Sequence, residues 1–130
     1  MSRILIVEDN EKNLKLLRDV LRHQGHEVLE APTGTQGLAL ALGERRPDLV
    51  LLDIQLPDID GITVLRRLRE DPGLDAVPVL AISASVMPEE QHRITASGFD
   101  AFVAKPISLK PFLATVGRFL SAGRTPGGSA

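Results

Sequence analysis

Asp48-Leu49-Val50-Leu51-Leu52-Asp53 is the stretch of sequence that decides the fold of this chain. Its four consecutive apolar residues between two aspartates predict a short strand that is buried on both faces, as the strands of a parallel sheet are. In open α/β sheets, ligands bind beyond the carboxyl ends of the strands. Because Asp53 stands at that end, we expect the other functional groups of the protein to gather around it.

Strand and helix patterns alternate along the whole chain. Strands are predicted at residues 3–7, 26–31, 48–53, 77–82 and 99–104. Helices are predicted to begin after Asn10, at Thr33 or Gly34, after Asp60, at Pro88 and after Ser108. This alternation implies parallel βαβ units with right-handed crossovers, and therefore an α/β domain.

The predicted fourth helix differs from the others in its apolar content. Ile94 and the flanking Met87 are its only large apolar residues. An element that buries little apolar surface is held weakly by the rest of the fold. We therefore expect the position of this helix to be easily biased.

Length, composition and charge exclude several classes of protein. The chain has 130 residues, of which 43% are hydrophobic and 25% charged, with a formal net charge of −2 and no cysteine. These values suit one globular domain, leave no disulfide or thiolate metal site, and indicate no surface for polyanions. The longest apolar run, residues 38–42, is too short for a membrane span or a signal peptide. We expect a cytoplasmic protein with no membrane partner.

Acidic residues follow two of the predicted strands. Glu8 and Asp9 come after the first strand, and Asp53 ends the third. If these strands are neighbours, three carboxylates meet at one edge of the sheet, and a hard divalent cation such as Mg²⁺ would relieve their repulsion. Asp9 taken alone would be an ordinary solvated acid, but the three residues together favour a metal site.

Two more polar residues are expected at the same edge. Lys105, after the fifth strand, can pair with a carboxylate or a phosphate oxygen, and the hydroxyl of Ser83, after the fourth, can bond a phosphate oxygen. Pro106 could hold the preceding peptide bond in the cis form, although trans is the default. Taken alone, Lys105 and Ser83 would be ordinary solvated loop residues.

Together these residues resemble the receiver domain of bacterial two-component response regulators, the CheY-like superfamily. The matching motifs are Val7-Glu8-Asp9-Asn10, Leu52-Asp53-Ile54-Gln55-Leu56-Pro57, Asp60-Gly61, Ser83-Ala84 and Phe102-Val103-Ala104-Lys105-Pro106-Ile107. The resemblance spans residues 3–120 and is closest to stand-alone regulators of the DivK type. It implies a single flavodoxin-like (βα)5 three-layer sandwich, with a parallel five-stranded sheet in the order 2-1-3-4-5.

The resemblance also implies where the domain ends. We expect a receiver domain over residues 1–121 and a flexible tail, rich in Gly, Pro and Ser, over residues 122–130. No output domain follows Leu120 in this sequence. That leaves open whether the protein signals by binding partners directly or is part of a longer chain.

The implied chemistry is centred on Asp53. This residue is the phosphoacceptor, and the phosphoryl donor is a phosphohistidine on a histidine kinase or a histidine phosphotransfer protein. Mg²⁺, with Mn²⁺ as an alternative, is held by Glu8, Asp9, Asp53 and the backbone carbonyl of Gln55. Such a site supplies positioning and charge neutralisation, which phosphoryl transfer needs more than covalent chemistry.

Further residues are implied to bind the phosphoryl group and to report its presence. Ser83 and Lys105 bind the phosphoryl oxygens, and Ser83 and Phe102 form the switch. The family more often has threonine in place of Ser83 and tyrosine in place of Phe102; the first hydroxyl is kept and the second is lost. Gln55 and Ser85 stand where the family tunes the lifetime of the phosphoryl group. Structural roles at the site fall to Pro57, Gly61, Ala84 and Pro106.

The predicted function is that of a response regulator in two-component signalling. Phosphorylation of Asp53 would switch the face formed by the fourth helix, the fifth strand and the fifth helix, so that it binds a downstream protein target. We expect a phosphoacceptor switch that assists its own phosphorylation and dephosphorylation, and not an enzyme that acts on other substrates.

Two alternative functions stay open on the residues alone. One is a receiver-fold interaction module that needs no phosphate, against which the intact acidic set and Lys105 argue. The other is a metal-dependent phosphatase: Asp58-Ile59-Asp60-Gly61 resembles the nucleophile motif of haloacid-dehalogenase phosphatases, but Gln55-Leu56-Pro57 separates it from the strand. No nucleic-acid partner is expected, because Arg66, Arg67 and Arg69 are predicted on a solvated helix face.

Overall fold

A computed structural model describes residues 2–84 and 87–122 of the chain. Within them, one parallel sheet has the strand order β2-β1-β3-β4-β5, as expected. The strands are β1 (Arg3–Val7), β2 (Glu27–Ala31), β3 (Leu49–Asp53), β4 (Val79–Ser83) and β5 (Ala101–Ala104). The helices are α1 (Glu11–His23), α2 (Gly34–Ala41), α3 (Gly61–Arg69), α4 (Pro88–Ala96), α5 (Leu109–Ala122) and the short 3₁₀ helix η1 (Pro72–Leu74). The flavodoxin-like α/β fold is confirmed.

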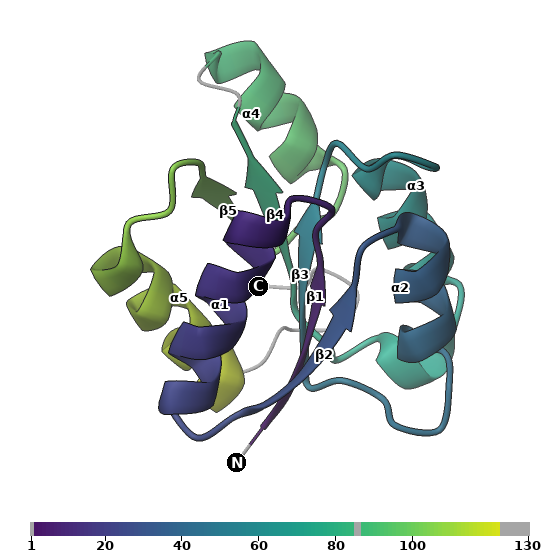
Figure 1. The fold of residues 1–130 in the computed structure, drawn as a ribbon. Helices are drawn as coiled ribbons and strands as arrows, with labels where there is room; N and C mark the ends of the chain where they lie inside the picture. The colour runs from purple at the N-terminus through teal and green to yellow at the C-terminus, as the bar shows by residue number, and fades with distance from the viewer. Residues whose placement is uncertain (1, 85–86, 123–130) are drawn as a thin grey trace.

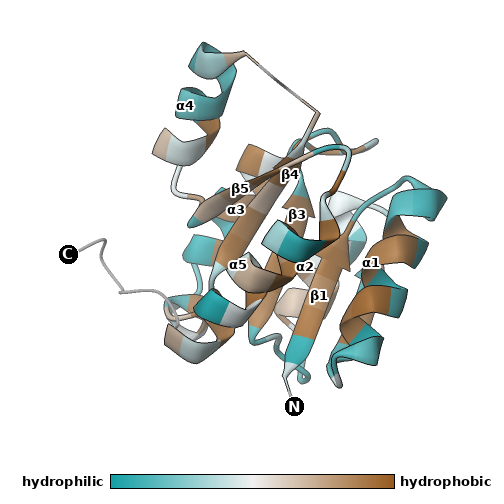
Figure 2. Cartoon of the chain, turned by 90° about the vertical axis from the view of Figure 1, so that its left-hand side faces the viewer, coloured by the Kyte–Doolittle hydropathy of each residue, from teal (hydrophilic) through white to brown (hydrophobic). Residues whose placement is uncertain are grey.

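The sheet is the middle of three layers (Figure 1). Helices α1 and α5 cover one face, and α2, α3 and α4 cover the other. Alternate residues of each strand enter different cores: Ile4 and Ile6 pack under α1 and α5, whereas Leu5 and Val7 pack under α2 and α3. Figure 2 shows the apolar strands enclosed by helices whose outer faces are hydrophilic. This double coverage explains why the strands read as unbroken apolar runs.

Strand β3 lies between β1 and β4, and all of its residues are buried. Its register sets the level at which neighbouring strands end: Val7 of β1 pairs with Leu52, and Ile82 of β4 pairs with Asp53. The residue after Val7 is therefore brought beside Asp53. This register is the structural origin of the site described below.

Three helices begin at side-chain caps; the sequence predicted the caps at Asn10 and Asp60, and for α2 predicted a start at Thr33 or Gly34. Asn10 accepts a hydrogen bond from the amide of Asn13, Thr33 from that of Gln36, and Asp60 from that of Thr63. Each cap satisfies an amide that has no partner within its own helix. These caps start α1, α2 and α3 close to the carboxyl edge of the sheet.

Four strands differ from their predicted bounds: β2 and β3 each begin one residue later than predicted, at Glu27 and Leu49, and β4 and β5 differ more. Strand β4 runs from Val79 to Ser83 and not over 77–82, because Pro78 has no amide to donate and only its carbonyl enters the ladder, accepting from Val50. Strand β5 begins at Ala101 and not at residue 99. Phe99 is buried in the core before the strand, so its apolar character marks packing and not strand pairing.

Helix α4 is held by little apolar contact, as its sequence predicted. Ile94 is its one buried residue. Met87, at the N-cap position, makes no side-chain cap and is 59% exposed. In Figure 2 the helix projects from the top of the molecule.

The C-terminal helix α5 ends at Ala122, the first residue of the predicted tail, and residues 123–130 lie outside the described residues. No helix among the described residues is long and apolar enough to cross a bilayer.

The first prediction concerns the weak attachment of α4. Ile94→Ala deletes the one buried side chain of this helix, and truncation of a buried Ile costs about 2–5 kcal/mol. We expect faster amide hydrogen exchange within α4 and little change in β1 and β3. Leu17→Ala, which truncates a fully buried residue of α1, serves as the control and should weaken protection throughout the sheet. Equal acceleration in α4 and β3 for Ile94→Ala would contradict this prediction.

Candidate functional site

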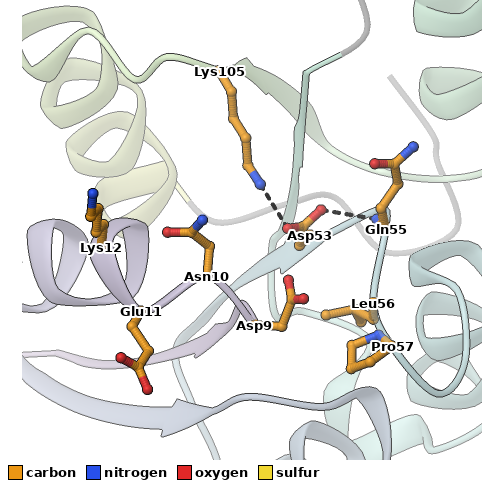
Figure 3. A pocket seen from close by; sticks show the side chains of 9 residues that line it. All are labelled: Asp9, Asn10, Glu11, Lys12, Asp53, Gln55, Leu56, Pro57 and Lys105. Carbon is orange, nitrogen blue, oxygen red and sulfur yellow. Dashed lines mark hydrogen bonds and ion pairs between the residues drawn. The ribbon is translucent and has the colours of Figure 1, made fainter.

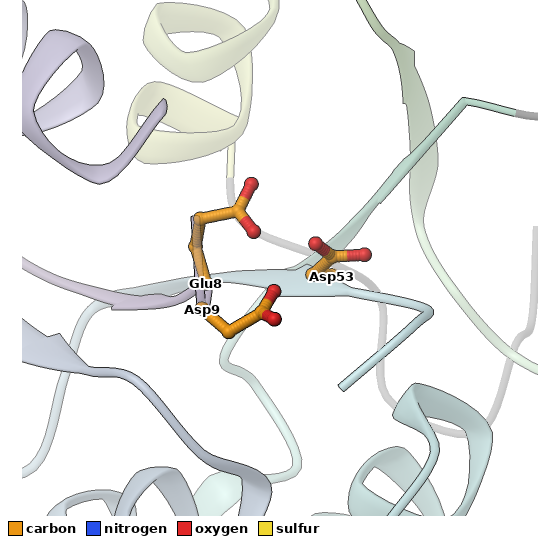
Figure 4. Close-up of side chains that lie close together, drawn as sticks. All are labelled: Glu8, Asp9 and Asp53. Carbon is orange, nitrogen blue, oxygen red and sulfur yellow. The ribbon is translucent and has the colours of Figure 1, made fainter. Parts of the chain in front are cut away.

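Three carboxylates meet at the carboxyl edge of the sheet, as the sequence predicted (Figure 4). One oxygen each from Glu8, Asp9 and Asp53 lies within 4.8 Å of the others. Glu8 is fully buried and Asp53 is 2% exposed, whereas Asp9 faces solvent. Glu8 follows β1 directly, and the β1–β3 register places it next to Asp53.

Lys105 reaches the same carboxylates from the end of β5, two strands away from β3. Its Nζ lies 2.8 Å from Asp53 Oδ2 and 3.0 Å from Glu8 Oε1. Its amide donates to the carbonyl of Ser83, and the Lys105–Pro106 peptide bond is cis, one of the two forms considered from the sequence. The lysine therefore lies over the buried acids and not in solvent.

The electrostatics of the site reflect this crowding. Burial, and after it the neighbouring Asp53, raise the pKa of Glu8 from 4.5 to about 7, against the lowering effect of Lys105. Burial opposes the charge of Lys105, but its hydrogen bonds and attraction to Asp53 and Glu8 outweigh burial and raise the pKa of the ammonium group. One ammonium group thus faces three carboxylates, which leaves the site with an excess of negative charge.

A hard divalent cation fits this donor set. All the available side-chain donors are carboxylate oxygens, the ligand type that Mg²⁺ prefers. The buried Oε1 of Glu8 has Lys105 Nζ as a charged neighbour at 3.0 Å, but the same Nζ also pairs with Asp53. A positive charge at this point would satisfy that oxygen and relieve the repulsion that raises the pKa of Glu8.

A cavity of about 790 Å³ opens over the acids (Figure 3). Its walls are Asp9, Asp53 and Lys105, the loop residues Gln55, Leu56 and Pro57, and the first turn of α1 around residues 10–12. The volume is many times the share of about 30 Å³ that a water occupies in the liquid. The site can therefore admit a phosphoryl group together with part of the molecule that donates it.

The loop after β3 is folded tightly against Asp53. The amide of Gln55 donates to Asp53 Oδ1 at 2.9 Å, and the amide of Gly61 donates to the carbonyl of Ile54 at 2.9 Å. A Cβ added at Gly61 would lie 2.6 Å from the carbonyl oxygen of Asp53 and 2.9 Å from Ile54 Cα. Glycine is thus needed where α3 begins, because the backbone of the phosphoacceptor candidate passes directly against it.

Ser83 and Phe102 lie beside the main cavity and not in its wall. Ser83 is the last residue of β4, not the first residue after it, and is 6% exposed. With Ala84 it borders a second cavity of about 510 Å³ between Gln55 and Met87. Phe102 is half-buried and faces a groove beside α4. Phe102 pairs with Ala81 and Ser83 with Ala104, so the two are diagonal neighbours on one face.

Of the remaining predicted residues, two line the main cavity, one is exposed and one is outside the described part of the chain. Pro57 and Gln55 line the main cavity, and Pro106 is exposed after the cis bond. Ser85 lies outside the described residues.

The sequence interpretation missed Asp58, whose carboxylate accepts hydrogen bonds from the first residues of α2. No pattern in the sequence indicated this contact, because its partners lie more than twenty positions earlier in the chain.

Comparison with known proteins assigns this site to a family. A family model described as the response regulator receiver domain matches residues 4–117. The chain belongs to this family. The polar-differentiation response regulator DivK of Brucella anthropi is 42% identical over 117 residues, which cover 90% of this chain and 94% of DivK. The predicted family and the likeness to DivK are confirmed.

Two solved receiver structures superpose closely on this one. The chemotaxis response regulator CheY4 of Vibrio cholerae is 25% identical with a TM-score of 0.84, covering 91% of this chain and 98% of CheY4. The receiver domain of a sensor histidine kinase from Pseudomonas aeruginosa is 28% identical with a TM-score of 0.84, covering 92% and 98%. That receiver has a magnesium ion coordinated in its active-site cleft.

Family membership establishes the general function of the chain. It is a response regulator receiver domain of two-component signalling. Receiver domains are signal switches that interact with histidine kinases and downstream targets, and they bind a divalent metal at an acidic site. The predicted function in two-component signalling is thereby confirmed.

The close approach of Gly61 to Asp53 gives the second prediction. Gly61→Ala should destabilise the protein by about 1–3 kcal/mol, because the new methyl group meets backbone atoms that cannot rotate away. The matched control is Gly117→Ala in α5, where a Cβ meets nothing within 4 Å and should add about 0.5–1 kcal/mol of stability.

Urea denaturation followed by far-UV circular dichroism measures both changes, since the chain contains no Trp or Tyr for fluorescence. Equal effects of the two substitutions would contradict the close approach at Gly61.

Proposed function

We propose that Asp53 accepts a phosphoryl group from a phosphohistidine of a partner histidine kinase or histidine phosphotransfer protein. The observation that supports this most directly is a buried carboxylate at the floor of an open cavity, 2.8 Å from a lysine Nζ. A carboxylate oxygen of Asp53 attacks phosphorus, the phosphorus–nitrogen bond breaks, and its electron pair returns to the histidine ring. The product is an acyl phosphate on Asp53.

The residues around Asp53 are suited to hold the charges of this step. Lys105 Nζ is positioned to pair with a phosphoryl oxygen once the group is attached, with the Ser83 hydroxyl as a second donor. Glu8, Asp9, Asp53 and the Gln55 carbonyl are the proposed magnesium ligands, with Asp9 and Asp53 in direct contact and Mn²⁺ as an alternative. The ion, when bound, would offset the charge of the phosphoryl oxygens.

The proposed switch uses Ser83, Phe102 and α4. Movement of Ser83 toward the phosphoryl group would free space beside it, and Phe102 is its diagonal neighbour on the same face of the sheet. Phe102 also faces α4, the helix with one buried residue. We propose that the face formed by α4, β5 and α5 binds the downstream target in a phosphorylation-dependent way, and that the protein assists its own phosphorylation and dephosphorylation.

The phosphatase alternative loses support from the positions of its motif. Asp58 accepts hydrogen bonds from α2, and Asp60 caps α3 through the amide of Thr63. Both aspartates are thus engaged at helix N-termini and neither lines the main cavity. The phosphate-independent module remains the rival of the proposed switch.

The third prediction tests the phosphoacceptor. Incubation with Mg²⁺ and acetyl phosphate should add one phosphoryl group to the protein, detected by intact mass and removed by hydroxylamine. Asp53→Asn replaces the nucleophile with an amide of the same shape and should show no adduct.

An adduct of equal mass on folded Asp53→Asn would place the phosphoacceptor elsewhere. If neither protein is labelled, including with a phosphorylated histidine kinase as donor, the phosphate-independent module is favoured.

The fourth prediction tests the switch. Beryllofluoride, a mimic of the phosphoryl group, should shift the backbone amide resonances of α4 and β5 and leave those of α2 close to their starting positions. Asp53→Asn should abolish the shifts. Identical spectra of α4 with and without the mimic, in a protein that binds it, would contradict the proposed movement.

A further inference from the structure

Asp58 ties the loop that borders the site to helix α2. Its Oδ1 accepts from the amide of Gly34 at 2.8 Å, and its Oδ2 accepts from the amide of Thr35 at 2.9 Å and from the Thr35 hydroxyl at 2.5 Å. These bonds lower the pKa of Asp58 well below its usual range, the Thr35 hydroxyl having the largest effect. Asp58 is therefore an anion that faces the positive end of α2.

Helix α2 already has a cap of its own. The Thr33 hydroxyl accepts from the amide of Gln36, and the amide of Gly37 donates to the Thr33 carbonyl. The Thr33 cap does not bond the amides of Gly34 and Thr35, and these two amides donate to the carboxylate of Asp58. The amides of Gly34, Thr35 and Gln36 are then satisfied, two of them by a residue from a different loop.

The loop that contains Asp58 is fixed at two points. Its base is closed by the bond from the Gly61 amide to the Ile54 carbonyl, and its far side is held by Asp58. Ile59 adds apolar contact to the same helix start: a Cβ on Gly34 would lie 2.6 Å from Ile59 Cγ1. Between these points lies Gln55, whose amide bonds Asp53 and whose carbonyl is the proposed metal ligand.

We infer that Asp58 is a positioning residue of the phosphoacceptor site, which holds the loop from Ile54 to Gly61 so that the Gln55 carbonyl stays in place for the cation. This inference rests on the proposed function, because it needs the metal site to be real. A cation such as Mg²⁺ demands near-ideal octahedral geometry, so a small displacement of one carbonyl weakens binding. Residues that orient metal ligands typically change metal affinity by 10–100-fold when they are replaced.

The test compares two substitutions that weaken the same end of α2. Asp58→Ala removes the bonds between loop and helix, whereas Thr33→Ala removes the helix's own cap and leaves the loop untouched. Mg²⁺ affinity is measured by following backbone amide resonances during titration. We expect Asp58→Ala to bind Mg²⁺ about 10-fold more weakly than wild type, and Thr33→Ala to bind it as wild type does. Equal losses in both variants would overturn the inference, because any weakening of α2 would then suffice.

A milder variant and a second readout protect the test against misfolding. Thr35→Val removes one of the three bonds to Asp58 and should give a smaller loss of Mg²⁺ affinity in the same direction. In the metal-free protein, Asp58→Ala should speed exchange of the loop amides of Gln55, Leu56 and Ile59, and Thr33→Ala should not. Wild-type affinity in Asp58→Ala and Thr35→Val would overturn the inference. A wild-type protein that binds no Mg²⁺ would instead refute the proposed metal site, whatever the exchange rates of the loop.

Discussion

Two carboxylates with almost no exposure, Glu8 and Asp53, lie at adjacent strand ends, and their mutual repulsion has to be balanced by the rest of the structure. Lys105 supplies part of the balance from two strands away, and its reach depends on the order β3-β4-β5. The two apolar cores fix that order by burying both faces of the sheet. A group that brings positive charge is therefore favoured at this edge, because the fold places these carboxylates close together.

Much of this arrangement could be predicted from the sequence because its determinants are local. The run from Leu49 to Leu52 identifies a doubly covered strand, and an acid directly after such a strand must emerge at the carboxyl edge. Polar residues at the carboxyl ends of three other strands add to the same edge, so the site follows from topology once the strands are known. The errors fell at strand ends: Pro78 contributes only its carbonyl to the ladder, and Phe99 is a core residue before the strand.

What the sequence could not give are contacts that depend on how loops approach one another. Asp58 is an acid in a loop between helix caps, and its sequence neighbours suggested a phosphatase motif. Its partners, Gly34 and Thr35, lie 24 and 23 positions away, and the packing of Ile59 against Gly34 also depends on how the two segments approach each other. The position of Ser83 beside a second cavity likewise depends on where β4 ends. The sequence placed the end of β4 one residue too early, so this position was not predicted.

The two sides of the site are held with unequal strength, and in the proposed switch this asymmetry favours movement on the α4 side. On the α2 side, Asp58 fixes the loop after β3 to α2, and the Gly61–Ile54 bond closes the base of the loop. On the α4 side, among the described residues, the helix starts at an uncapped Met87 and buries Ile94 alone. A change of charge at Asp53 acts on both sides of the site. We expect the larger movement in α4, because less free energy of packing opposes it there. In the proposed switch, the fixed loop would hold Asp53 and Gln55 in place while the weakly held helix moves, so that Asp53 would serve both as phosphoacceptor and as trigger.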